Sequence, residues 1–375
     1  MIARSDFFMV PLTQWLARWF GVVLAVALMT GCATSTERGV LNFGINTASP
    51  ETKRLTWPPS ADAEVPRFVF AGELTGEENF RAPQEKRTGA SAFLHWLAGL
   101  FDMEEKLVVL QRPLSGVVDE DGRIFVTDSS RQAVFVFDPQ EGRLIIWEGA
   151  TAVAHFVAPA GIALGMSGEV YVADSELGIV ARLNRKGESV GVIGSGELRH
   201  PVGLAFDAAM QRLYVADTHD HDIKVFDADG RLLHTLGRRG EKPGEFNYPT
   251  YLALAKGELY VTDTMNARVQ VLSAETGESK QIVGERGMNM GNLVRPKGVA
   301  VDDEGNIYIV ESYYDHLLMF NNKGEFLMSI GGTGHRPGNF YLPSGVWIDA
   351  NNRIFVADMF NGRVTLFQFL GGDAQ

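Results

Sequence analysis

Imidazole, phenol and guanidinium side chains in a few polar loops are the groups of this sequence best suited to binding or catalysis. His219 and His221 form an H-x-H pair in the segment THDHD, and Tyr313, Tyr314 and His316 gather in the segment SYYDH. Tyrosine and arginine are enriched where proteins recognise partners. We therefore predict a binding site made of Arg112, His200, His219, His221, Tyr248, Tyr251, Arg295, Tyr313, Tyr314 and His316. The alternative is sequence drift in exposed loops.

A repeat with a period of 42 to 48 residues positions these loops. Each repeat opens with a proline and has an acidic residue 14 to 16 positions later. Short β-branched and aromatic runs, separated by turn residues, follow each proline and predict strands. A multi-strand unit at a fixed period indicates a β-propeller, and six units predict six blades. The prolines are Pro113, Pro159, Pro201, Pro249, Pro296 and Pro343, and the acids are Asp128, Asp174, Asp217, Asp263, Glu311 and Asp358.

The repeat unit resembles the NHL repeat. The matching features are the P-x-G opening, the strand ending VAD or VTD, and the N-x-R that follows, as in Asn266/Arg268 and Asn361/Arg363. Loops with glycine and proline at Gly237–Phe246 and Gly332–Phe340 also match. The resemblance covers residues 66–375 and implies an all-β, six-bladed propeller. It implies less about function, because NHL propellers serve binding, scaffolding and some enzymes.

The two faces of such a propeller differ in their loops. With the strands of a blade lettered a to d from the axis outwards, the d-to-a and b-to-c loops emerge on one face, which we call the loop-rich face. These loops are long and varied, whereas the a-to-b and c-to-d turns on the other face are short and uniform. We therefore predict that the loop-rich face binds the ligand. The acids present in every blade are interpreted as structural acceptors for backbone N–H groups of the following turn.

Metal catalysis is an alternative use of the histidines. Similarity to NHL-like propellers implies it, because these include a peptide-amidating lyase that holds zinc with histidines at the channel mouth. Here His155, His200 and His335 lie in three d-to-a loops of one face, so a metal-dependent lyase or hydrolase with Zn or Ca is the second hypothesis. The first hypothesis needs no cofactor and no catalytic residue. No nucleophile elbow or phosphate-binding loop is present.

The last repeat ends after three strands, so the ring needs a strand from elsewhere. Arg67–Gly72 (RFVFAG) has the missing pattern, and we predict that it completes the last blade and leaves no exposed edge. Residues 81–106 are an insertion, in which the apolar residues of Ser91–Met103 have helical spacing. We expect this helix to pack on the propeller, and partner docking is the alternative.

Residues 1–31 have the pattern of a secretory signal peptide. Arg4 and Arg18 precede the apolar run Trp19–Met29, and small residues follow it. The segment LMTGCA resembles a bacterial lipobox, which implies that Cys32 carries lipid and that residues 32–65 form a tether. Ala33 after the cysteine implies the outer membrane, facing the periplasm or the cell surface. The alternative is an ordinary buried or free cysteine.

The composition limits the partners. The formal net charge is −12 and no basic stripe is visible, so we expect no nucleic acid. The single cysteine excludes an internal disulfide. We expect a lipid-anchored binding or scaffold protein of the bacterial cell envelope, which touches the membrane only through its anchor. Its partner would be an envelope protein, a peptide or a glycan, and the oligomeric state is not predicted.

Overall fold

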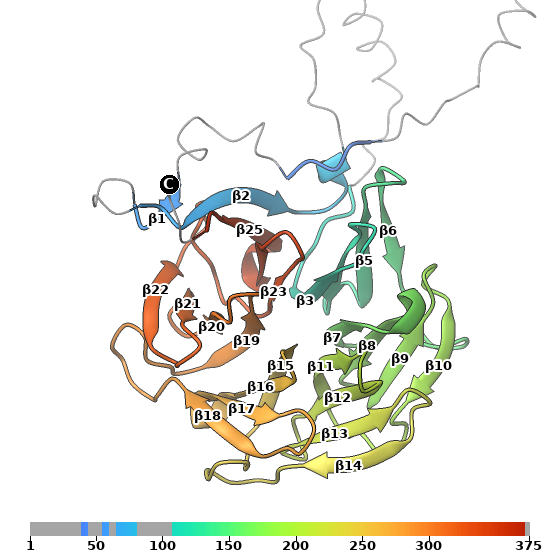
Figure 1. Cartoon of the computed structure of the whole chain (residues 1–375). Helices are drawn as coiled ribbons and strands as arrows, with labels where there is room; N and C mark the ends of the chain where they lie inside the picture. The colour runs from blue at the N-terminus through green and yellow to red at the C-terminus, as the bar shows by residue number, and fades with distance from the viewer. Residues whose placement is uncertain (1–38, 44–54, 60–64, 81–106, 372–375) are drawn as a thin grey trace, which may run out of the picture. The chain divides into compact units, whose positions relative to one another are not determined.

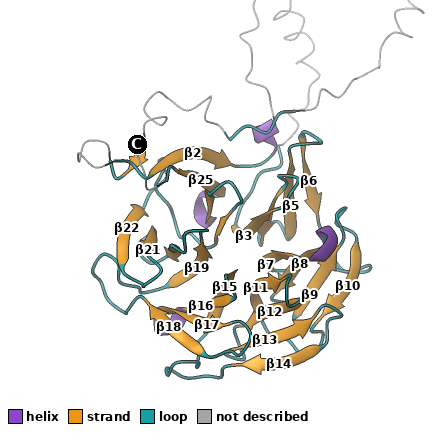
Figure 2. Cartoon of the chain, in the orientation of Figure 1, coloured by secondary structure: helices purple, strands orange, loops and turns teal. Residues whose placement is uncertain are grey.

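The computed structural model describes residues 39–43, 55–59, 65–80 and 107–371. Within them, six antiparallel sheets surround a central channel (Figures 1 and 2). This arrangement confirms the six-bladed β-propeller. The predicted helix within residues 81–106 and the predicted signal peptide lie outside the described residues, as does Cys32. None of the helices in the described ranges has the length and apolar character needed to cross a membrane.

The strands of each blade follow one another in the chain, except in the last blade. Blade 1 consists of β3 (Pro113–Val118), β4 (Ile124–Asp128), β5 (Ala133–Asp138) and β6 (Arg143–Trp147). Blade 2 consists of β7 (Pro159–Leu164), β8 (Val170–Asp174), β9 (Ile179–Leu183) and β10 (Ser189–Ile193). Blade 3 consists of β11 (Pro201–Asp207), β12 (Arg212–Asp217), β13 (Asp222–Asp227) and β14 (Leu232–Leu236).

The second half of the ring repeats this pattern. Blade 4 consists of β15 (Pro249–Ala255), β16 (Glu258–Asp263), β17 (Arg268–Ser273) and β18 (Ser279–Val283). Blade 5 consists of β19 (Pro296–Val301), β20 (Ile307–Glu311), β21 (His316–Phe320) and β22 (Phe326–Gly331). Blade 6 has β23 (Val346–Ile348), β24 (Arg353–Asp358) and β25 (Arg363–Phe369). Single 3-10 turns are η3 (Glu77–Phe80), η4 (Met166–Gly168), η5 (Thr264–Asn266) and η6 (Met359–Asn361).

An N-terminal strand closes the ring, as the sequence predicts. Strand β2 (Phe68–Leu74) pairs antiparallel with β25, with Phe70 opposite Phe367. The strand begins one residue later and ends two residues later than the predicted Arg67–Gly72. A fifth strand, β1 (Thr56–Trp57), pairs with the outer side of β2 (Figure 1). The ring is therefore held by a sheet that joins the two ends of the propeller.

Parts of the predicted tether lie on the propeller. The Glu73 N–H donates to the Phe43 carbonyl at 2.8 Å, and the Asn42 N–H donates to the Asn79 carbonyl at 2.7 Å. The Trp57 ring packs edge-on against Phe367, with ring centroids 5.3 Å apart. Residues 39–43 and 55–59 thus cover the closing blade.

The middle strands of each blade are buried on both faces, because every sheet is packed between two neighbours. All residues of β4 and β5 are buried. Between blades 1 and 2, Phe125 and Val136 pack with Val172 and Ala181 in one apolar cluster. Complete burial of a Val or Phe side chain stabilises the fold by about 1.5–3 kcal/mol. The continuous apolar runs of the repeat are therefore the core of the molecule.

The buried acids connect the two kinds of loop on the loop-rich face. Asp174 is fully buried, and its carboxylate accepts N–H groups of Val157 at 2.7 Å, Ala158 at 3.1 Å and Leu177 at 3.0 Å. The first two donors precede the opening proline, and the third lies in the b-to-c turn. Our sequence interpretation named only the following turn and missed the donors before the proline. Asp174 thus holds a d-to-a loop against a b-to-c loop, and Asp128 and Glu311 do the same in blades 1 and 5.

Candidate functional site

Among the loops and turns, exposed large apolar side chains are concentrated in the d-to-a and b-to-c loops. Nine lie there, namely Val153, Val157, Tyr248, Met265, Met288, Met290, Tyr313, Tyr341 and Phe360, and seven others lie on the outermost strands β10, β14, β18 and β22. On the opposite face, the described residues include three such side chains: Met166 in an a-to-b turn, and Val65 and Leu370 beside the ends of β2 and β25. Scattered exposed apolar residues need no explanation, but their concentration on one face marks an interaction surface.

Four predicted site residues come together at the junction of blades 2, 3 and 4, and we call them the histidine cluster: His200, His219, His221 and Tyr248. The rings of His200 and His219 stack, with centroids 4.1 Å apart. Tyr248 packs edge-on against His221 at 4.6 Å, and its N–H donates to His221 Nδ1 at 3.1 Å. His221 is buried and acts as a support, whereas His219 and Tyr248 are exposed. Burial and the neighbouring His219 lower the pKa of His200, which favours the neutral ring.

Sequence reasoning missed a charge cluster beside the loop that contains His219 and His221. The Lys224 ammonium lies 3.3 Å from Asp217, 2.9 Å from Asp220 and 3.1 Å from Asp222. Burial disfavours the charge of Lys224, but the hydrogen bonds that its ammonium donates to Asp220 and Asp222 outweigh this effect and raise its pKa. Three carboxylates around one lysine hold the THDHD loop in place. The sequence signal for this cluster was Lys224 in the segment DIK, close to the acids of THDHD.

Three further predicted residues lie together in blade 5. The rings of Tyr313 and Tyr314 meet edge-on at 4.9 Å, and Tyr313 is exposed. Tyr314 and His316 line a cavity of about 120 Å³, which we call the blade-5 pocket. Asp315 is structural, because its carboxylate accepts the Leu342 N–H and the Thr333 hydroxyl, both at 2.7 Å.

Blades 6 and 1 add an aromatic group at the loop-rich face. Arg112 is exposed and its guanidinium lies 5.2 Å from the centre of the Phe360 ring. Phe360 contacts Tyr341 at 5.6 Å, and Tyr341 contacts His335 at 5.8 Å. Sequence reasoning missed Phe360 and Tyr341, because it searched for departures from the repeat and both lie in a repeat that follows the pattern.

Tyr251 lies inside the channel and not at its rim. Tyr251 occupies the position that is glycine in the P-x-G opening of other blades. The corresponding glycine of blade 3, Gly203, has no room for a side chain, because an added Cβ would lie 2.3 Å from the Thr250 carbonyl oxygen. The Tyr251 hydroxyl donates to the Leu114 carbonyl of blade 1 at 3.1 Å, across the ring from blade 4. Burial raises its pKa to about 12. Tyr251 therefore stays a neutral cross-brace between opposite blades.

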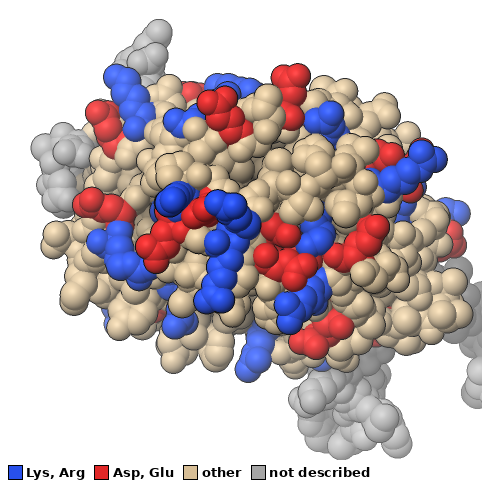
Figure 3. All heavy atoms as spheres, turned by 90° about the horizontal axis from the view of Figure 1, so that it is seen from below, with Lys and Arg blue, Asp and Glu red and all other residues tan. Residues whose placement is uncertain are grey.

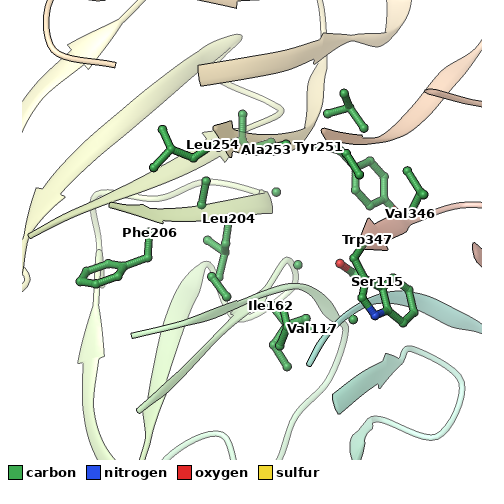
Figure 4. A pocket seen from close by; sticks show the side chains of 18 of the residues that line it. Ser115, Val117, Ile162, Leu204, Phe206, Tyr251, Ala253, Leu254, Val346 and Trp347 are labelled. Carbon is green, nitrogen blue, oxygen red and sulfur yellow. The ribbon is translucent and has the colours of Figure 1, made fainter. Parts of the chain in front are cut away.

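The side chains that line the channel are mostly apolar. The cavity of about 350 Å³ is bounded by the inner strands of all six blades, and Figure 4 shows Ile162, Leu204 and Val346 among its lining. Tyr251 is the only titratable residue of this lining. Lys297 directly follows the opening proline of β19. Burial lowers the pKa of Lys297, and the positive charge of Arg295, which is exposed, adds to this shift.

The three histidines of the metal hypothesis do not form a common site. Across the described ranges, no group of three or more His, Cys, Asp or Glu side chains is placed to hold a metal ion. His200 stacks on His219, and His335 Nδ1 contacts the side-chain oxygen of Asn361. His155 forms a backbone bridge with Gly149.

Charges of both signs are intermingled on the side of the molecule that lies at the bottom of Figure 1, as Figure 3 shows. Nucleic-acid binders carry a basic patch or stripe on one face, and this side does not have one.

Comparisons with known proteins agree with the repeat and the fold. A family model described as a 6-bladed beta-propeller matches residues 206–281 and 292–374. The chain is 30% identical to Protein brain tumor of Drosophila melanogaster over 135 residues, which are 35% of the chain and 12% of that protein. A gluconolactonase structure from Xanthomonas campestris has a TM-score of 0.54 and 14% identity, over 80% of this chain and 98% of its own. Such a structural likeness concerns the fold alone.

A relative that is matched over most of its own length shows the family to which the chain belongs. The chain is 34% identical to NHL-repeat-containing protein 4 of Homo sapiens over 110 residues, which are 29% of this chain and 79% of that protein. The repeat length, the P-x-G openings and the six closed blades agree with this match. The chain therefore belongs to the NHL-repeat proteins.

Proposed function

We propose that this protein is a binding or scaffold module that recognises a protein or peptide partner of the bacterial cell envelope on its loop-rich face. An NHL-type propeller is compatible with an interaction scaffold and with a propeller enzyme. The observation that carries the proposal is the unequal distribution of exposed apolar side chains between the two faces. Aromatic anchors of this kind supply most of the binding energy of protein interfaces.

The anchors are held in place before a partner arrives. Tyr248 is fixed by His221, Phe360 by Arg112 and Tyr341, and Tyr313 by Tyr314. Side chains that are already ordered lose little rotamer freedom on binding, and this raises affinity. The side chains that line the channel are mostly apolar, and His155, His200 and His335 do not share a site.

Partner capture should depend on the loop-rich face. A variant with Tyr248→Ala, Tyr313→Ala and Phe360→Ala removes one exposed anchor from each of three loops. We expect it to lose partner binding by a factor of 100 or more, since each aromatic anchor contributes about 1–2 kcal/mol and 1.4 kcal/mol is tenfold. The measurement is quantitative capture of cross-linked envelope proteins by the purified chain.

The matched control changes the opposite turns, with Asp229→Ala, Arg231→Ala and Lys323→Ala. These three residues are exposed or nearly so, and partner capture should survive their replacement. Equal capture by both variants would exclude the loop-rich face as the binding surface. Stoichiometric metal in the purified protein, lost on replacing His200 or His335, would favour the lyase or hydrolase instead.

The membrane attachment is proposed to be a lipid on Cys32, on the grounds of the LMTGCA segment. Stable anchoring needs more than one acyl chain, which lipoprotein processing supplies. Cys32→Ser protein should leave the membrane fraction on cell fractionation, while the wild-type chain remains with it. Membrane retention of the variant at the wild-type level would place the anchor elsewhere.

A further inference from the structure

Blades 4 and 6 each contain an arginine that fills a socket between two loops. In blade 4, Arg268 Nε donates to the Asp263 carboxylate at 2.8 Å. Its Nη2 donates to the carbonyls of Lys242 and Glu245, each at 3.0 Å. The guanidinium therefore joins the buried acid of the blade to the preceding d-to-a loop.

Blade 6 repeats this geometry. Arg363 Nε donates to the Asp358 carboxylate at 2.8 Å, and Nη2 donates to the carbonyls of Arg336 at 3.3 Å and Asn339 at 2.9 Å. Both sockets consist of a buried carboxylate and two loop carbonyls. These acceptors match a planar cation with several N–H donors.

Blade 5 has the same loop but lacks the arginine. His316 stands where blades 4 and 6 have Arg268 and Arg363, and the loop positions of the two carbonyls are Asn289 and Asn292. The loop is folded alike, because the Asn292 N–H donates to the Asn289 carbonyl at 2.9 Å, as the Glu245 N–H does to Lys242 at 3.0 Å. The blade-5 pocket of about 120 Å³ lies at this place and is lined by Asn289, Asn292, Glu311, Tyr314, His316 and Leu318.

The electrostatics of the pocket favour a cation. Glu311 is 1% exposed and accepts N–H groups of Val294, Arg295 and Tyr313. No ion pair to Glu311 exists in the described part of the chain, whereas Asp263 and Asp358 each have one. Within the same residues no donor reaches the Asn292 carbonyl, because Leu318 replaces the glutamine that bonds the corresponding carbonyl in blade 4. A buried negative charge and an open carbonyl are thus left for a ligand.

We propose that the blade-5 pocket receives the guanidinium of an arginine from a partner protein, in place of the arginine that blades 4 and 6 supply themselves. This inference rests on the proposed function and names the chemistry of the partner segment. The side chains of Met288, Met290 and Tyr313 are 83%, 59% and 57% exposed at the rim. Methionine adapts to irregular partners and aromatic rings attract cations, so this rim suits the aliphatic stem and the backbone around the arginine. Lysine would bind less well, since its ammonium cannot address three separated acceptors in one plane.

The test uses acetyl-Gly-Arg-Gly-amide, with citrulline and lysine versions of the same peptide as controls, titrated by NMR or calorimetry at low salt. Citrulline keeps the shape of arginine without the charge. We expect the arginine peptide to bind at least tenfold more tightly than either control. Equal binding of all three peptides, or none, would overturn the proposal.

A His316→Arg variant supplies the missing arginine from within the chain. It should fold, keep or raise the melting temperature, and lose the arginine peptide by tenfold or more. Lys323→Arg, which adds an arginine on the opposite face, is the matched control and should bind like wild type. Glu311→Gln removes the charge without filling the pocket and should also weaken binding tenfold, so the proposal stays testable if His316→Arg misfolds. Unchanged binding in both pocket variants would contradict it.

The two proposals fail differently. If the Tyr248, Tyr313 and Phe360 variant loses the envelope partner while His316→Arg affects neither partner nor peptide, the binding face stands and the arginine socket is wrong. If His316→Arg abolishes peptide binding while the Tyr248, Tyr313 and Phe360 variant captures the partner like wild type, the arginine socket stands and the proposed function is wrong.

Discussion

Removing residues 1–74 is expected to abolish cooperative folding of the propeller. The deletion removes β2, so β25 would lose its partner and present an unpaired edge, which promotes aggregation. Phe68, Phe70 and Leu74 of β2 are buried, and each contributes about 1.5–3 kcal/mol. Together they amount to about 5–9 kcal/mol, which is comparable with the whole stability of about 5–15 kcal/mol of a typical domain. Loss of a single sharp thermal transition, with aggregation by light scattering, is the expected result.

Two shorter deletions serve as controls. Deleting residues 1–38 leaves every described contact intact and should not change the melting temperature. Deleting residues 39–64 removes Leu41, Phe43 and Trp57, which pack against the closing blade, but keeps β2. An intermediate loss of about 2–4 kcal/mol is expected for it. Equal melting of the 1–74 deletion and the full chain would show that β2 does not close the ring.

Replacing Arg363 by alanine is expected to destabilise the protein by about 3–5 kcal/mol, because it leaves a buried carboxylate without its cation. Asp358 is fully buried and lies 2.8 Å from Arg363, and Glu73 of β2 lies 2.7 Å from the same guanidinium. Arg363 therefore ties the buried acid of blade 6 to the closing strand. The measurement is the free energy of unfolding from chemical denaturation.

The control for charge alone is Arg143→Ala. Arg143 pairs with Glu141 on the surface, where both side chains are largely exposed, and such pairs contribute about 0–1 kcal/mol. A loss below 1 kcal/mol for Arg363→Ala as well would contradict the role of the buried pair.

The defect of Arg363→Ala should also depend on pH. Burial already raises the pKa of Asp358 and of Glu73, and Arg363 opposes both shifts. Without the arginine, both pKa values rise further in the folded state, so protonation at lower pH neutralises the unpaired charges. The loss of stability relative to wild type should therefore be smaller at pH 5 than at pH 8.

Much of the architecture follows from the sequence alone, because a propeller is built from local units. Each blade pairs strands that are adjacent in the chain, so the proline-to-acid spacing was enough to predict six blades and the two faces. The closing strand was also predictable, since the count of strands in the last repeat left one place empty. The motif with Asn361 and Arg363 marked the last blade in the sequence. Once the closing strand is placed beside that blade, the contact between Arg363 and Glu73 follows.

Tertiary structure alone decided how the candidate site is assembled. Tyr251 is a departure from the repeat, but only the ring places it across the channel from Leu114, 137 positions away. The stacking of His200 on His219 and the empty socket beside His316 depend on how loops of neighbouring blades meet. Such contacts join residues that share no local pattern, and their geometry follows from side-chain packing between blades. Repeat spacing determines which loops share a face, whereas only packing determines which of their side chains touch.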